Sequence, residues 1–202
     1  MRPDPARSLG CAVLLATLAV WPALARADAA TTEYVDAQYR FTFRFPADWQ
    51  RERVPTPGEG GEVRLAAKSA ARPIFVLAIV SPIGAAITRE DFERRPDRDA
   101  LVEELIRRSL DQVYAKMSRD LSASRMVVDE TQRRASDGGI GFSIQTTHTT
   151  PEGPTTVAGT HVFPFGQPYA ITLMVVARGA GATPAEVETR RRLLDSLKVN
   201  AP

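Results

Sequence analysis

The segment from residue 125 to 177 most constrains the fold, because it predicts a series of strands with only short turns between them. Between the strands lie turn sequences rich in Gly, Pro and Asp, and consecutive strands with such short connections pair antiparallel. The strands are expected at Arg125–Glu130, Ile140–Thr149, Thr155–Phe165 and Tyr169–Ala177, and the turns at Asp137-Gly138-Gly139, Pro151-Glu152-Gly153-Pro154 and Gly166-Gln167-Pro168.

Three further strands are predicted in the first half of the chain. Residues Tyr39–Phe45 alternate aromatic and polar side chains with a period of two, which is typical of a half-buried strand ending at Pro46. Glu62–Lys68 is a second candidate strand. Ile74–Val80 is apolar throughout, and a short continuous apolar run favours a strand that is covered on both faces.

Two helices complete the predicted fold. The first follows Pro96, where Leu101, Ile106, Val113 and Met117 belong to one apolar stripe with helical spacing. The second begins at Thr183-Pro184-Ala185-Glu186, a capping Thr followed by Pro at the first helical position and Glu at the third. Because runs of strands are combined with separate helices, the fold class is α+β, with helices packed on the faces of an antiparallel sheet.

The N-terminus has the pattern of a secretory signal peptide. Arg2 and Arg7 precede an apolar run from Leu9 to Leu24, and small residues at the A-x-A positions follow. We expect cleavage after Ala27 or Ala29, so that residues 1–27 form the signal peptide and residues 28–202 a single domain located in the periplasm or secreted. The run is shorter than a membrane-spanning helix requires. Cys11 lies at the start of the apolar run, whereas a lipoprotein site needs the run upstream of its cysteine, which argues against lipidation.

Charge gives no indication of a polyanionic partner. The chain has 26 Lys and Arg against 24 Asp and Glu, and the segment after Ala27 has equal numbers of basic and acidic residues. No basic stretch is interleaved with aromatic residues, so nucleic acid is not an expected partner. The only cysteine, Cys11, lies in the predicted signal peptide, so the exported domain would have neither a disulfide nor a catalytic thiol.

The two histidines, His148 and His161, are candidate metal ligands. If Pro151–Pro154 forms the whole turn, Phe142 pairs with Phe163 and Ile144 with His161. His148 would then lie about 13 Å from His161 at 3.3 Å per residue, too far for one metal ion to bind both. We therefore expect no metal site and interpret His161 as a buried histidine on an aromatic face.

Ser143 is the candidate nucleophile of a hydrolase, with His161 as its base. Catalysis by serine needs a base within hydrogen-bonding reach and a carboxylate that orients it. Ser143 lies within a predicted strand, and the expected register turns it to the face opposite His161. A solvent-facing serine is the favoured interpretation, so no catalytic residue and no cofactor is assigned.

An aromatic cluster follows the first predicted strand. Phe45, Asp48 and Trp49 could form a recognition surface, because Trp is a preferred anchor in protein interfaces. The alternative is that the rings only pack in the core.

The stretch from Tyr39 to Trp49, an aromatic strand that runs into Pro46-x-x-Trp49, resembles the opening signature of the PsbP-like family. The order of elements, ending in residues 194–199, is also similar, so that the resemblance spans Tyr34 to Val199. It implies an α/β/α sandwich with a central antiparallel sheet. It also implies a non-enzymatic role, typically docking onto a larger assembly.

These observations favour an exported, non-enzymatic accessory or binding protein that contacts another envelope protein. Two alternatives stay open. One is a hydrolase that uses Ser143 or His161, and the other is a carrier of a small ligand or lipid with its pocket between helix and sheet.

Overall fold

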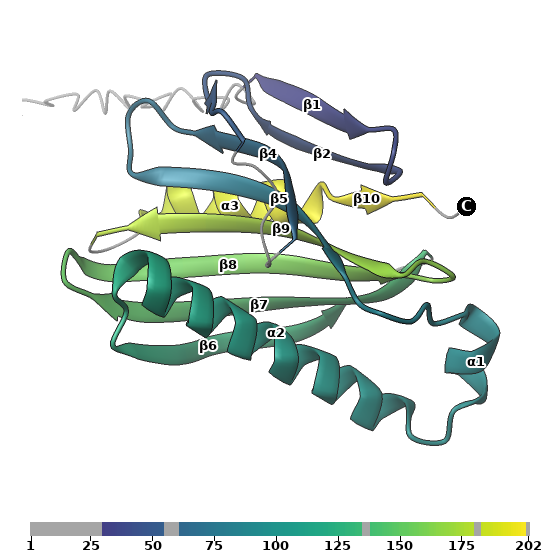
Figure 1. Ribbon diagram of the computed structural model, residues 1–202. Coiled ribbons are helices and arrows are strands. Elements are labelled where there is room, and N and C mark those ends of the chain that lie inside the picture. The colour runs from purple at the N-terminus through teal and green to yellow at the C-terminus, as the bar shows by residue number, and fades with distance from the viewer. Residues whose placement is uncertain (1–29, 55–60, 135–137, 180–182, 201–202) are drawn as a thin grey trace, which may run out of the picture.

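The computed structural model describes residues 30–54, 61–134, 138–179 and 183–200, shown in colour in Figure 1. The predicted signal peptide, with Cys11 and both cleavage positions, lies outside these residues. In chain order the elements are β1 (Thr31–Asp36), β2 (Phe41–Pro46), β3 (Gln50–Arg51), β4 (Glu62–Lys68), β5 (Ile74–Pro82), α1 (Arg89–Arg94), α2 (Arg98–Leu121), β6 (Arg125–Arg134), β7 (Gly139–Thr150), β8 (Gly153–Pro164), β9 (Tyr169–Arg178), α3 (Pro184–Asp195) and β10 (Lys198–Val199).

A seven-stranded sheet forms the centre of the molecule, in the order β3-β4-β5-β9-β8-β7-β6. All its neighbouring strands pair antiparallel, as the short turns predicted. β5 is covered on both faces, which confirms the interpretation of its continuous apolar run. Val76 and Ala78 belong to the core on one face and Ile79 to the core on the other.

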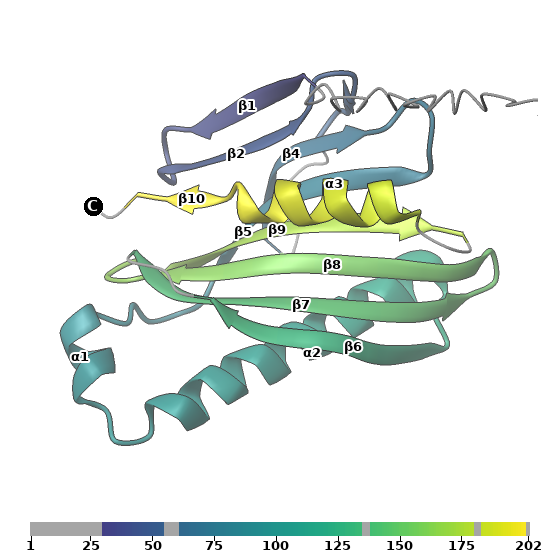
Figure 2. The ribbon, with the colours of Figure 1, turned by 180° about the vertical axis from the view of Figure 1, so that it is seen from behind.

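The two faces of this sheet are covered differently. Helix α2 packs on one face through Val102, Ile106, Val113 and Met117 (Figure 1). Helix α3 lies on the opposite face beside a small sheet of order β1-β2-β10 (Figure 2). The predicted α/β/α sandwich with a central antiparallel sheet is therefore confirmed, and the small sheet is an addition to it. No helix in the described part of the chain has both the length and the hydrophobicity needed to cross a membrane.

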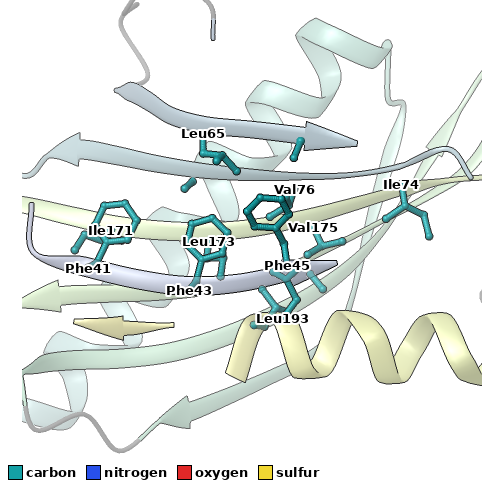
Figure 3. Packing of buried hydrophobic residues seen from close by; sticks show 14 of the residues in the cluster. Phe41, Phe43, Phe45, Leu65, Ile74, Val76, Ile171, Leu173, Val175 and Leu193 are labelled. Atoms are coloured by element: carbon teal, nitrogen blue, oxygen red, sulfur yellow. The ribbon is translucent and has the colours of Figure 1, made fainter. Parts of the chain in front are cut away.

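The small sheet is attached to the large one by the phenylalanines of β2. Phe41, Phe43 and Phe45 alternate along the strand, are at most 2% exposed, and pack with Leu173 of β9 and Leu193 of α3 (Figure 3). Burying three large rings is a substantial hydrophobic contribution, about 2 kcal/mol or more for each. The alternating aromatic side chains seen in the sequence therefore all point to the core and hold β2 against the central sheet.

The start of α3 has the capping arrangement that the sequence predicted. The Glu186 amide donates to Thr183 Oγ1 at 3.3 Å, and the Thr183 amide donates to Glu186 Oε2 at 2.6 Å. We expect Thr183→Ala to lower the free energy of unfolding by about 1 kcal/mol, because both amides lose this reciprocal arrangement. Urea unfolding measures the change. Thr189→Ala, inside the same helix, is the control and should be neutral or slightly stabilising; equal losses in both variants would contradict a capping role.

Candidate binding surface on the open face of the sheet

The β7–β8 hairpin has a tighter turn than the sequence suggested. Pairing continues to Thr150 opposite Gly153, so only Pro151 and Glu152 form the turn, and Gly153 has a φ of +107°. The expected pairs are therefore wrong by two residues. Phe142 lies opposite His161 instead of Phe163, and Ile144 lies opposite Gly159. Because the error is even, every side chain keeps its predicted face.

His161 is a buried histidine on an aromatic face, as predicted from the sequence. It is 6% exposed, and its ring stacks on Phe142 with centroids 5.1 Å apart. Nδ1 lies 3.0 Å from Thr172 Oγ1, whereas Nε2 is buried without a hydrogen-bond partner near Gly159. Burial lowers the pKa of His161 to about 4, so the ring is neutral near neutral pH.

His148 is fully buried on the same face, and its Nε2 lies 2.9 Å from Thr146 Oγ1. Burial lowers its pKa, with the nearby Asp129 acting in the opposite direction. In the corrected register His161 is opposite Phe142, six strand positions from His148, which is about 20 Å instead of about 13 Å. A single metal ion cannot bind both rings. The described residues contain no group of three or more His, Cys, Asp and Glu side chains placed to hold a metal ion.

Ser143 lies on the opposite face of the sheet from His161. It pairs with Thr160 of β8, whereas the neighbouring pair, Phe142 and His161, faces α2. Successive strand residues point to opposite faces, so the sheet itself separates the hydroxyl of Ser143 from the imidazole of His161. These two residues cannot act together as nucleophile and base.

The face that carries Ser143 is only partly covered. Among the described residues, the core beneath α3 and the small sheet includes Ala158 of β8 but no residue of β6 or β7 (Figure 2). The uncovered area carries uncharged polar side chains that are half-buried or exposed, and we call this group of side chains the open face. Its residues are Gln132, Ser143, Gln145, Thr147 and Thr156. Asp129 and Glu130 of the edge strand β6 lie beside them on the same side.

A groove of about 470 Å³ separates the open face from the C-terminal end of α3. Its central charged residue is Arg134, at the end of β6. Arg134 Nη1 donates to Thr160 Oγ1 at 3.2 Å and to the Leu194 carbonyl at 3.3 Å, and Nη2 pairs with Asp195. Burial lowers the pKa of Arg134, but a guanidinium keeps its charge at any physiological pH. The groove is therefore a polar hollow with one fixed ion pair in its wall.

A second hollow of about 340 Å³ lies on the α2 side of the same end of the sheet, beside Phe92 and Phe165. Arg133 borders both hollows, and its guanidinium contacts Asp99 at 2.5 Å and Glu103 at 3.0 Å on α2. Hydrogen bonds to these carboxylates raise the pKa of Arg133. The two carboxylates compensate the positive charge of Arg133. Their contacts with Arg133 also link α2 to β6.

The residues that the sequence predicted as a recognition surface lie elsewhere, at the end of β2. Asp48 is exposed and Trp49 is half-buried against the core. Phe45, which Figure 3 shows within the core cluster, is 2% exposed. Phe45 can support such a surface only from beneath, and a role for Trp49 and Asp48 remains a prediction. The open face was missed, although the alternation of Ser143, Gln145 and Thr147 along β7 is visible in the sequence.

No protein-family model and no curated protein matches the chain. Solved structures with a similar fold include cyanobacterial PsbP (CyanoP) from Synechocystis sp. PCC 6803, with a TM-score of 0.54 and 14% identity over 87% of this chain and 96% of that one. A point mutant of the protein Mog1 has a TM-score of 0.50 at 7% identity over 85% of this chain and 97% of that one. The Ran-binding protein Mog1p of Saccharomyces cerevisiae has a TM-score of 0.49 at 8% identity, over 86% and 97% of the two chains. The chain therefore has the PsbP-like fold.

Proposed function

We propose that the protein is an exported, non-enzymatic accessory protein that binds another protein of the cell envelope through its open face. The observation that carries this proposal is the composition of that face. About a quarter of the whole chain is charged, yet the half-buried side chains that β7 and β8 place on that face, Ser143, Gln145, Thr147 and Thr156, are all uncharged. The charged residues beside them on the same face, Arg125, Asp129 and Glu130, all lie on the edge strand β6. The centres of protein interfaces are depleted of charged residues in the same way.

The border of the open face supports the same proposal. Arg134 and Asp195 lie along the α3 side, and Arg125 and Glu130 lie on β6. A charge-poor centre with a charged rim is the usual arrangement of a non-obligate interface. The groove beside α3 gives this otherwise flat surface a place where a partner side chain can insert.

Export is the second part of the proposal and depends on residues 1–27. Their positive start, apolar run and A-x-A site support a signal peptide, and a partner in the envelope follows from it. The resemblance to the PsbP-like family supports a docking role in place of catalysis. A hydrolase that combines Ser143 with His161 has no support, because the two side chains lie on opposite faces of the sheet.

The test introduces a charge at the centre of the open face. Partners captured from the native envelope by the wild-type protein are identified and purified, and their affinity is then measured by calorimetry. We expect Gln145→Arg to weaken binding about tenfold or more, because the new charge must lose its hydration in the complex. Gln112→Arg, an exposed position on α2, is the matched control and should change affinity less than about twofold.

Two results would contradict the proposal. A purified partner that binds the Gln145→Arg variant as tightly as the wild type would place the interface elsewhere, and the region around Trp49 and Asp48 would be the next candidate. Failure to recover any reproducible partner would remove the binding role itself.

A small ligand in the groove is the alternative, since the groove volume of about 470 Å³ is within the range of small-molecule sites. A co-purifying mass in native mass spectrometry would favour this alternative.

A further inference from the structure

Strand β6 is a free edge of the seven-stranded sheet. It spans ten residues, whereas β3 at the opposite edge spans two. A long free edge presents backbone amides and carbonyls that can pair with another strand, and proteins usually cover or interrupt such edges. Figure 1 shows β6 at the border of the sheet, and no described strand lies beyond it. This edge is therefore the place where a further strand could be added.

The side chains of β6 indicate what that strand would contain. Val127 and Val128 are each 43% exposed, two of the five large hydrophobic residues exposed in the described part of the chain. The side chains of Arg125 and Glu130 form no hydrogen bond or ion pair with another described residue. Asp129, in contrast, accepts a hydrogen bond from Thr147 Oγ1 at 2.7 Å. An added strand that suits this edge would cover the two valines and place an acidic side chain beside Arg125 and a basic one beside Glu130.

A second copy of β6 meets these requirements when the two strands run antiparallel with Val127 on the two-fold axis. Val127 then lies opposite Val127 of the second copy, and Met126 opposite Val128. Asp129 is the bulge residue that the pairing with β7 leaves out. When the new pair leaves it out as well, Arg125 lies opposite Glu130. Each of these pairs joins residues of the same face, as an antiparallel pair requires, because Arg125, Val127 and Glu130 all face the side of Ser143.

The competing register is disfavoured by charge. Placing the two-fold axis on Glu130 would put this acid opposite its own copy and Arg125 opposite Arg134. Like charges directly opposite each other destabilise a strand pair. Only the register centred on Val127 joins the unpaired base to the unpaired acid, and it does so twice because of the symmetry.

We propose that two copies of the protein associate by antiparallel pairing of β6 with β6, in the register centred on Val127. The two seven-stranded sheets then join into one continuous sheet. The two-fold axis is perpendicular to this sheet, so both open faces lie on the same side. This inference goes beyond the proposed function, because the dimer would form whether or not an envelope partner exists. Such a partner would meet two adjacent binding surfaces on the dimer.

Sedimentation velocity over a concentration series of the purified, processed protein tests the proposal. We expect a reversible dimer in the wild type. Val127→Lys should abolish it, since two ammonium groups would meet on the axis. The matched control is Val187→Lys on α3, where the valine is 47% exposed, and it should leave the dimer unchanged.

Charge reversal then tests the register itself. Arg125→Glu should raise the dimer dissociation constant about tenfold or more, because two attractive pairs become repulsive. Glu130→Arg should have the same effect, and combining the two substitutions should restore the dimer. A protein that is monomeric at all concentrations would overturn the proposal. So would a dimer that survives Val127→Lys, or one that the combined charge reversal does not restore.

Discussion

Acidification from about pH 6.5 to about pH 4 is expected to lower the free energy of unfolding by about 3 kcal/mol, mainly through His161. Its pKa is about 4 in the folded protein and near 6.5 in the unfolded chain. Below pH 6.5 the unfolded chain therefore binds a proton that the folded protein does not, and stability falls. Below pH 4 both states are protonated and the loss is complete.

The physical cause is the surroundings of the ring. His161 is stacked on Phe142 under α2, and its buried Nε2 has no neighbouring acceptor for the hydrogen bond that a doubly protonated ring would donate. His148 acts in the same direction, since its pKa is also lowered by burial. The lowered pKa of the buried Asp36 is below this pH window, whereas Glu186 and Glu188, whose pKa values are also lowered, begin to lose their stabilising contribution at its acid end. The contribution of His161 is therefore the part of the loss that a substitution of this residue removes.

Urea unfolding at a series of pH values measures this effect. His161→Gln keeps a polar group near Thr172 but cannot take up a proton, so most of the slope between pH 6.5 and 4 should disappear. His148→Gln is the comparison, and it should keep the contribution of His161. A His161→Gln variant with the same pH dependence as the wild type would show that the imidazole is already solvated in the folded state.

Replacement of Asp36 by Ala is expected to lower the free energy of unfolding by about 3 kcal/mol, the lower end of the range for a broken buried ion pair. Asp36 is 3% exposed and accepts from Arg64 Nε at 2.6 Å and from the Tyr39 amide at 2.9 Å. Burial by itself would raise the pKa of Asp36, but these hydrogen bonds outweigh it and the pKa is lowered. The loss is limited because the Arg64 side chain is 22% exposed and can gain water.

A matched control for Asp36 lies on the same strand. Glu33 of β1 pairs with Arg44 of β2 at 3.5 Å, and both side chains are more than half exposed. Glu33→Ala should change stability by less than about 1 kcal/mol, as is usual for surface ion pairs. Urea midpoints of the two variants measure the difference. If both losses were small, the contact of β1 with β4 through Asp36 and Arg64 would not hold the two sheets together.

The sequence predicted the elements that have strong periodicity or a capping signal. The bounds of β4 were predicted to the residue, and the capping box of α3 has both of its hydrogen bonds. β1, β3, α1 and β10 were not predicted. β1 has only one large apolar side chain, Tyr34, on its core-facing side, and none of the six residues of α1 is buried. β3 and β10 have two residues each and are strands only because β4 and β2 lie beside them.

The hairpin register could not be predicted because two rules gave different answers. Matching aromatic residues favoured Phe142 opposite Phe163, whereas the two-residue turn at Pro151 and Glu152 places Phe142 against His161. Turn geometry determines the register, and the stacking of the two rings follows from it. The open face was missed for a different reason: alternation shows which residues share a face, but not which strands α3 and the small sheet leave uncovered.

The pairing of β10 with β2 joins the two ends of the described chain: Lys198 lies opposite Thr42 and Val199 opposite Phe41. A chain that emerges with its N-terminus first cannot complete this pairing until Lys198 and Val199 have emerged. Until α3 has also formed, the phenylalanines of β2 lack the cover that this helix gives them. Folding should therefore finish only after residue 199 has left the ribosome or a translocation channel, and a helper that shields apolar segments would be most useful before then.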